Sequence, residues 1–269
     1  GLKVLASKGI HIVVPKEAIE AETGIFLRTE KSVLFIIPWP RYWVIGTTDT
    51  AWHENIDHPV ATSADIDYVL DHANAVLEKP ISRKDIIGVY AGLRPLLQPG
   101  VKEGESGETA STKVSREHTV TEVAPGLTSI AGGKLTTYRV MAADAVDFAL
   151  GVEQTKVHPT CTERLALVGA AGLDEVTARS GEIARAHGWT LARVDHLLSR
   201  YGAETQDLIE LIDAKPEYGQ PLESAPAFLK AEVVWAVTHE GALHLDDIIV
   251  HRVRLDLEHS DHGLAAADE

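Results

Sequence analysis

Short apolar runs separated by turn residues dominate the first half of the chain. The clearest runs occupy residues 10–14, 33–37 and 43–46. Further runs follow at 86–92, 114–123 and 127–130, with Ala124-Pro125-Gly126 as a turn signal between the last two. Runs of this length bounded by Pro and Gly predict strands, and the first half therefore predicts a sheet.

Two stretches in the same half have the three-and-four spacing of a helix instead. Thr62 and Asp65 fit a capping box, and apolar residues then recur on one face as far as Leu77. A second face of this kind runs from Tyr138 to Leu150. Strands interrupted by one crossover helix predict an α+β domain with a mixed or antiparallel sheet over residues 1–152.

The pattern becomes helical in the second half. Residues 154–162 are the predicted linker, and helical spacing marks 174–187, 190–201, 206–212, 226–239 and 245–253. Gly188 and Gly202 follow two of these segments, where glycine commonly ends a helix. We therefore expect an all-α domain over residues 160–258 and a disordered tail over residues 259–269.

Composition limits the class of protein. The 269 residues are 45% hydrophobic and 24% charged, which is ordinary for one or two globular domains. No run approaches the ~20 apolar residues of a membrane span. The formal net charge of −15 argues against a nucleic-acid partner. Cys161 is the only cysteine, which suits a reducing compartment, and we expect a cytoplasmic location.

The stretch from Gly132 to Arg139 joins a predicted strand to a predicted helix. Gly132 and Gly133 let the backbone approach a flat or bulky group closely. The helix start that follows has N–H groups without intrahelical partners, and Lys134 and Arg139 add positive charge. These features suit anionic oxygens. A tight turn with two solvated bases explains the same residues equally well.

Three further side chains, His11, Arg94 and Arg116, accompany predicted strands. Each also has an ordinary structural explanation. His11 fits a buried structural histidine, Arg94 fits a surface ion pair, and Arg116 fits an ion pair with Glu117. Taken together with Lys134, the three predict a pocket for an anion such as phosphate.

Other chemistries lack their sequence patterns. His239-Glu240 and His244 have a gap of five residues between the histidines, where the metalloprotease pattern has four. Because a structural zinc site also usually needs more than one cysteine, we expect no metal. The sequence contains no nucleophile elbow, no Walker loop and no G-x-G-x-x-G fingerprint.

Five motifs, in this order, resemble the FAD-dependent glycerol-3-phosphate dehydrogenase family. They occupy residues 7–15, 45–50, 91–96, 115–118 and 132–139. The helical half is similar to that family's C-terminal domain through Arg200-Tyr201-Gly202, Ala231-Glu232-Val233 and His239-Glu240-Gly241-Ala242. The chain resembles the C-terminal portion of such an enzyme, without the N-terminal Rossmann segment that holds the ADP part of FAD.

The resemblance implies oxidation of glycerol 3-phosphate to dihydroxyacetone phosphate, with hydride passing to flavin N5 of FAD and electrons to a quinone. It implies catalytic roles for His11 and Lys134, and His11 is our first choice of base because an ordinary imidazole has a pKa of ~6.5. The substrate-binding residues would be Arg94, Arg116 and Lys134. The cofactor-binding residues would be Gly132, Gly133, Lys134, Leu135, Thr136, Thr48 and Asp49.

The further partners expected from the resemblance are the missing N-terminal FAD-binding segment, a second copy in a homodimer and the inner face of the cell membrane. Three alternatives stay open: a glycerol-3-phosphate oxidase that uses oxygen, a non-catalytic interaction or dimerisation module, and an FAD oxidoreductase of amines. The clustered bases favour a phosphate substrate over an amine. We expect the isolated chain to be colourless and inactive, because it lacks the phosphate-binding βαβ unit.

Overall fold

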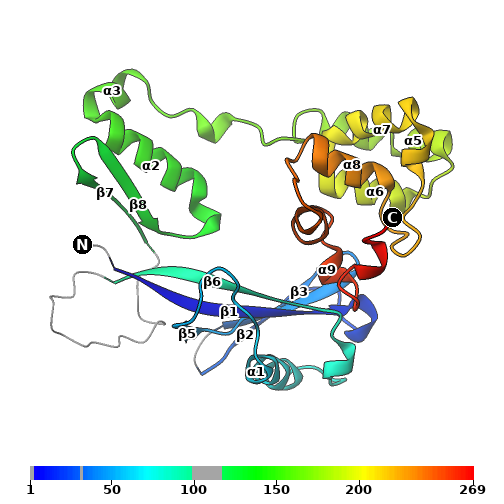
Figure 1. The fold of residues 1–269 in the computed structure, drawn as a ribbon, viewed down its shortest axis with the longest axis horizontal. Coiled ribbons are helices and arrows are strands. Elements are labelled where there is room, and N and C mark those ends of the chain that lie inside the picture. Colours follow the sequence, from blue (N-terminus) through cyan, green and yellow to red (C-terminus); the bar gives the residue numbers. More distant parts are fainter. Residues whose placement is uncertain (1–2, 31–32, 99–116) are drawn as a thin grey trace. The chain divides into compact units, whose positions relative to one another are not determined.

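The computed structural model describes residues 3–30, 33–98 and 117–269, and it divides the chain into two compact units, Gly1–Glu163 and Arg164–Glu269. The main sheet of the first unit contains β1 (Lys3–Pro15), β2 (Ile25–Arg28), β3 (Val33–Pro38), β4 (Tyr42–Gly46), β5 (Thr50–Trp52) and β6 (Gly88–Gln98) (Figure 1). The strands predicted in this part of the chain are confirmed, although β1 and β6 are longer than the apolar runs at 10–14 and 86–92 from which they were predicted.

The main sheet is antiparallel, and the long strand β1 is its centre. The order along the sheet is β2-β3-β4-β1-β5, and β6 pairs with the other edge of β1. Strand β6 follows β1 from Lys3 to Val13, whereas β4 and β5 share the opposite edge. Side chains therefore alternate between two faces along β1, and each residue from Lys3 to Val13 shares its face with the β6 residue opposite it.

One face of this sheet is covered by α1 (Ser63–Asn74) (Figure 1). The capping box predicted at its start is confirmed: the Thr62 hydroxyl accepts the Asp65 N–H, and the Asp65 carboxylate accepts the Thr62 N–H. Ile10, Ile12 and Val14 of β1 are fully buried on this face and pack in one cluster with α1. The residues that alternate with them, among them Ser7, Gly9 and His11, consequently lie on the opposite face.

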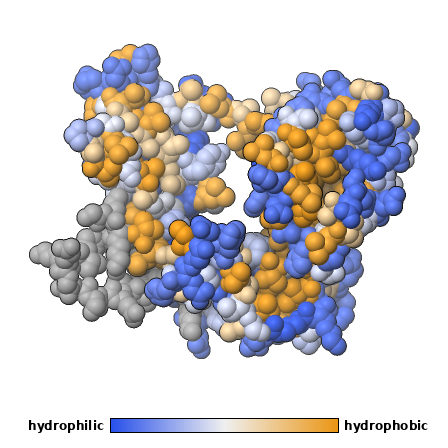
Figure 2. Space-filling view, in the orientation of Figure 1, coloured by the Kyte–Doolittle hydropathy of each residue, from blue (hydrophilic) through white to orange (hydrophobic). Residues whose placement is uncertain are grey.

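A separate two-stranded hairpin follows in the first unit. Strands β7 (His118–Ala124) and β8 (Leu127–Gly132) lead through a 3-10 turn into α2 (Tyr138–Leu150) and α3 (Val152–Val157). The predicted helix is confirmed, but none of the residues of α2 is buried. Figure 2 shows hydrophobic residues at the surface over α2 and the hairpin. The first residues of the strand predicted at 114–123 lie outside the described residues.

The second unit is helical, which confirms the predicted α+β chain with an all-α second half. It contains α4 (Leu173–Ala178), α5 (Ser180–His187), α6 (Leu191–Tyr201), α7 (Thr205–Ala214), α8 (Lys230–Thr238), the π-helix η8 (Asp247–Arg252) and α9 (Leu255–Glu258). The predicted helix at 174–187 is therefore two helices, and the one at 226–239 begins four residues late. Its start is displaced because Glu232 accepts the Leu229 N–H at 2.8 Å and fixes the first turn there.

The C-terminal tail differs from the disorder that we expected for residues 259–269. Residues Leu264–Ala266 form a 3-10 turn, and Ala266 packs against a buried cluster that includes Val253 and Leu255. The Glu269 carboxylate accepts hydrogen bonds from the N–H groups of Glu223 and Ser224. A polar, alanine-rich tail carries no periodic signal, and these long-range contacts are invisible in the sequence.

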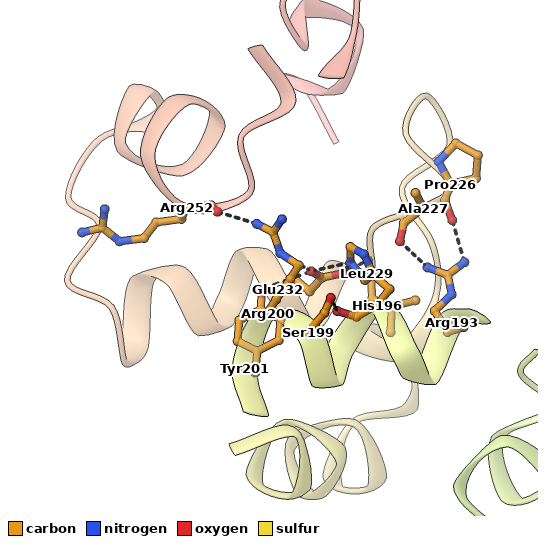
Figure 3. Close-up of polar contacts among 10 residues, drawn as sticks. All are labelled: Arg193, His196, Ser199, Arg200, Tyr201, Pro226, Ala227, Leu229, Glu232 and Arg252. Carbon is orange, nitrogen blue, oxygen red and sulfur yellow. Dashed lines mark hydrogen bonds and ion pairs between the residues drawn. The ribbon is translucent and has the colours of Figure 1, made fainter. Parts of the chain in front are cut away.

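A buried carboxylate ties three helical elements of this unit together (Figure 3). Glu232 of α8 is 0% exposed, and its carboxylate lies 3.0 Å from His196 Nε2 and 3.6 Å from Arg200 Nε, both on α6. The Tyr201 hydroxyl donates to it at 3.1 Å, and burial together with the Glu232 charge raises the pKa of this phenol. Arg200 also donates to the Arg252 carbonyl of η8.

Candidate active site

The face of the main sheet opposite α1 brings together side chains from β1 and β6. In the register of this pair, Ser7 lies opposite Arg94, Gly9 opposite Gly92, and His11 opposite Tyr90. Directly opposed residues of antiparallel strands share a face. His11 and Arg94, two of the residues predicted to form one pocket, therefore lie on the same side of the same sheet.

The Arg94 side chain lies along this face over Gly9. A Cβ at Gly9 would collide with the Arg94 guanidinium and would come within 2.6 Å of Thr47 Oγ1. Arg94 Nη2 donates to Thr47 Oγ1 at 2.9 Å, and Nη1 lies 3.9 Å from Asp49 Oδ1. Because Gly9 stands between Ser7 and His11, the guanidinium points along the strand toward the histidine.

The corner between β4 and β5 surrounds this arginine. The Asp49 side chain is 1% exposed, and its Oδ1 accepts a hydrogen bond from the Ser7 hydroxyl. The Thr48 hydroxyl accepts the Ile10 N–H at 3.1 Å, which fastens the corner to β1. Both predicted residues of this corner thus contact the sheet, and their assignment to the cofactor stays a prediction.

His11 is held flat between two neighbouring strands. Its ring stacks on Tyr90 with the centroids 5.0 Å apart and an interplanar angle of 12°. A Cβ at Gly46 of β4 would come within 2.7 Å of His11 Cγ, so only glycine leaves room for the ring. Burial, followed by the positive charge of Arg94, lowers the pKa of His11 from 6.5 to about 4. The imidazole is therefore neutral at pH 7.

Among the residues that the structure describes, the position between the two functional groups is open. None of their heavy atoms lies within 4 Å of a Cβ built on Gly92. Gly92 lies two residues from Arg94 and two from Tyr90, and two residues of a strand span about 7 Å. A small molecule that binds Arg94 by an anionic end and presents a hydroxyl to His11 fits this length.

The glycine pair before Lys134 forms a left-handed turn at the end of β8. Gly132 and Gly133 have φ of 83° and 82°, values that side chains other than glycine adopt at a cost. Lys134, Leu135 and Thr136 that follow are exposed, and Leu135 is 88% exposed. A backbone kept free of Cβ atoms, next to an exposed lysine and a helical start, fits the polar edge of a large flat cofactor.

The structure places the Lys134 turn on a different element from the His11 and Arg94 pair. Strand β8 contacts β6, and a Cβ at Gly132 would come within 2.8 Å of Leu97 Cδ1. The Lys134 N–H donates to Thr137 Oγ1 at 3.4 Å, and Thr137 Oγ1 donates back to the Lys134 carbonyl at 3.0 Å. Arg116, the other predicted substrate residue, lies outside the described residues. Among the residues that are described, no group of three or more His, Cys, Asp or Glu side chains is arranged to hold a metal ion.

Comparison with known proteins identifies the class. The family model described as "FAD dependent oxidoreductase" matches residues 1–139, and that described as "C-terminal domain of alpha-glycerophosphate oxidase" matches residues 160–269. The chain belongs to the FAD-dependent oxidoreductase family. Its cofactor is accordingly FAD, as predicted.

The relatives narrow the class further. The chain is 48% identical over 267 residues to a glycerol-3-phosphate dehydrogenase of Mycobacterium leprae, and 47% identical to glycerol-3-phosphate dehydrogenase 2 of Mycobacterium tuberculosis. Each alignment covers 99% of this chain and 44% of the relative. The crystal structure of the glycerol-3-phosphate dehydrogenase from Bacillus halodurans complexed with FAD superposes with a TM-score of 0.75 at 27% identity, over 96% of this chain and 49% of that one. The chain thus spans about half the length of the proteins it matches.

Sequence reasoning missed several residues that shape this site. Ser7, Gly9, Thr47 and Tyr90 contact or flank the predicted pair, yet none of them was singled out as a site residue. The available signal was the alternation along residues 7–12, where Lys8, Ile10 and Ile12 occupy the other face.

None of the described helices is both long enough and apolar enough to cross a membrane.

Proposed function

We propose that this chain is the substrate-binding part of an FAD-dependent enzyme that oxidises glycerol 3-phosphate to dihydroxyacetone phosphate. The observation that carries the proposal is the arrangement of Arg94 and His11 on one sheet face, with the open Gly92 position between them. One end suits a phosphate and the other suits a hydroxyl. The names of the relatives support this substrate.

Arg94 is the proposed phosphate ligand. Its guanidinium presents a planar fork of donors, which matches two phosphate oxygens better than a lysine ammonium does. Thr47 fixes one nitrogen of the fork at 2.9 Å, so little side-chain freedom is lost when the ligand binds. Arg116 and Lys134 are the other cations that we propose for the substrate.

His11 is the proposed base. Oxidation of a secondary alcohol removes the hydroxyl proton, and a neutral imidazole has the lone pair to accept it. The lowered pKa keeps His11 neutral, and a bound phosphate next to Arg94 would offset the positive charge that contributes to this lowering. The stacked Tyr90 ring holds the imidazole plane in place during the transfer.

FAD supplies the acceptor for the hydride from C2 of the substrate. We assign Gly132, Gly133, Lys134, Leu135 and Thr136 to hold its polar ring edge, with Thr48 and Asp49 shaping the pocket. Lys134 also serves as a catalytic cation that stabilises negative charge on the substrate oxygen. The positive φ values and the exposure of this turn support that assignment.

A quinone is the proposed final electron acceptor. The relatives are named dehydrogenases, which supports an acceptor other than oxygen. Because quinones with long isoprenoid tails dissolve in the bilayer, a quinone-linked enzyme needs a peripheral contact with the membrane. Oxygen is the second candidate, since the model matching residues 160–269 is described from an oxidase.

The test uses the purified full-length protein loaded with FAD. Without oxygen, we expect glycerol 3-phosphate to reduce a soluble quinone analogue and to yield one dihydroxyacetone phosphate per quinone. The absence of dihydroxyacetone phosphate from an FAD-loaded preparation would refute the function. An oxygen electrode then separates the two acceptors: rapid formation of peroxide in air, with slow quinone reduction, would establish an oxidase.

A further inference from the structure

We propose that Ser7 is a positioning residue for phosphate binding: it orients the Asp49 carboxylate, which in turn aligns the Arg94 guanidinium. This inference rests on the proposed phosphate site. Ser7 is 0% exposed and lies directly opposite Arg94 in the β1–β6 register. Its hydroxyl does not face solvent, and its acceptor is Asp49 Oδ1.

The three side chains form a short relay across the sheet. Asp49 comes from the corner after β4, Ser7 from β1 and Arg94 from β6. The same Oδ1 atom that accepts the Ser7 hydrogen bond lies 3.9 Å from Arg94 Nη1. Ser7 therefore acts on the atom that faces the guanidinium, so a change in the Asp49 rotamer would change the charge next to Arg94.

The relay matters because a phosphate and Asp49 would share one cation. A carboxylate at 3.9 Å steers the guanidinium without closing a tight bidentate pair with it. The Ser7 hydroxyl that donates to this carboxylate stabilises its charge and keeps it 3.9 Å from the guanidinium, so the donors of Arg94 stay available to a phosphate. Without that hydroxyl, we expect Asp49 to move toward Arg94 and compete with the ligand.

A purely structural role for Ser7 predicts different behaviour. The corner that carries Asp49 is already fastened to β1 by the Thr48 and Ile10 hydrogen bond. On the other face, Lys8 Nζ lies 2.6 Å from Asp65 Oδ2 and donates to the Val60 carbonyl at 3.2 Å. These contacts should keep the fold intact when the Ser7 hydroxyl is removed, so the loss should appear in phosphate binding.

The experiment compares Ser7→Ala, Ser7→Cys, Arg94→Lys and the Ser7→Ala/Arg94→Lys double variant in the FAD-loaded full-length protein. Ser129→Ala on β8 is the matched control, because its hydroxyl is on a different strand and outside the relay. The measured quantities are KM for glycerol 3-phosphate, kcat, the inhibition constant of inorganic phosphate and the melting temperature. Because Ser7 reaches the ligand only through Asp49 and Arg94, Ser7→Ala should raise KM and the phosphate inhibition constant about three- to tenfold, which is less than the loss of a hydrogen bond made directly to a charged ligand.

The decisive result is non-additivity. If Ser7 acts through Arg94, Ser7→Ala should raise KM by less than twofold in the Arg94→Lys background, while kcat stays within twofold of the parent. Additive effects, or an unchanged KM and inhibition constant in Ser7→Ala, would overturn the proposal. So would loss of FAD or of the folded state in both Ser7→Ala and Ser7→Cys, because Ser7 would then be structural.

The same data separate this inference from the proposed function. Should the parent protein fail to oxidise glycerol 3-phosphate, the function fails, and binding of inorganic phosphate measured by calorimetry still tests Ser7. In that case, weaker phosphate binding by Ser7→Ala supports the relay, and equal binding refutes it. An active parent with an unaffected Ser7→Ala variant refutes the relay alone.

Discussion

Acid should destabilise the first unit through His11, and His11→Gln should remove that sensitivity. The pKa of His11 is lowered from 6.5 to about 4. Between these pH values His11 is therefore protonated in the unfolded chain and neutral in the folded chain. The stabilisation is therefore fully present above pH 6.5 and is lost as the pH falls toward 4. The full shift corresponds to about 3 kcal/mol, and about 2 kcal/mol is lost between pH 7 and pH 5.

Urea unfolding at pH 7 and pH 5 measures this effect. The pH dependence of the variant is compared with that of the parent, because other groups titrate over the same interval; burial raises the pKa of Glu240, for example. His11→Gln should also lower stability at pH 7 by losing the stack on Tyr90, so only the difference between the two pH values is diagnostic. His53→Gln, an exposed histidine of the same unit, is the matched control and should behave as the parent does.

The pKa of His11 can also be measured directly. In an NMR titration, the imidazole resonance that disappears in His11→Gln should titrate near pH 4 in the parent and should move to a higher pH in Arg94→Gln, since the arginine charge contributes to the lowering. A parent resonance that titrates at about 6.5, or parent and variant stabilities that fall equally from pH 7 to pH 5, would contradict the reasoning. His11 would then be solvated, and the acidic limb of kcat/KM would lie near pH 6–7.

Three further predictions follow from the contacts. Arg94→Lys in the full-length enzyme should raise KM for glycerol 3-phosphate by roughly tenfold without changing FAD content, because a bidentate fork becomes a point charge; steady-state kinetics measure this. Lys134→Ala should worsen both KM and the rate of flavin reduction in stopped flow, and normal values for both would move Lys134 out of the site. Glu232→Ala should cost about 3 kcal/mol or more in chemical denaturation, since it removes a buried carboxylate shared by several donors, whereas exposed Glu182→Ala should cost less than about 0.5 kcal/mol.

Local signals in the sequence were enough to predict the sheet, its crossover helix and the class of the second half. Pro15 and Pro38 end strands where the chain places them, and Thr62 with Asp65 caps α1 as expected. These features depend on neighbours in the sequence. Strand pairing does not, and the pairing of β1 with β6 is what brings Arg94 beside His11. The sequence motifs were enough to select His11 and Arg94. Their contacts with Ser7, Thr47 and Tyr90 follow from the strand pairing, which the sequence does not reveal.

Two corrections in the helical half concern hydrogen bonds accepted by glutamate side chains. Helix α8 begins at Lys230 because the buried Glu232 side chain caps it. The last residues are held in place because the side-chain carboxylate of Glu269 accepts the N–H groups of Glu223 and Ser224. Periodicity reports the face that a helix buries but contains no information on these side-chain hydrogen bonds, whether the partner is three residues away, as for Glu232 and Leu229, or 45 residues away, as for Glu269 and Ser224. Both corrections therefore concern ends of segments, where hydrogen bonds decide the structure.

The helical motifs of the resemblance have a structural explanation in this geometry. Arg200 and Tyr201 of α6 converge on Glu232 of α8, and Arg200 continues to the Arg252 carbonyl, while Arg252 donates to the Glu240 carbonyl at 2.7 Å. All of these partners are in the second unit, and removing one would strand a buried charge. The motifs that identify the helical half are therefore explained by its own polar core, whereas the motifs at 7–15, 45–50 and 91–96 contribute His11, Thr47 and Arg94 to one face of the main sheet. Substitutions in the helical motifs should therefore lower the free energy of unfolding, whereas substitutions in the motifs of the sheet face should change KM and kcat.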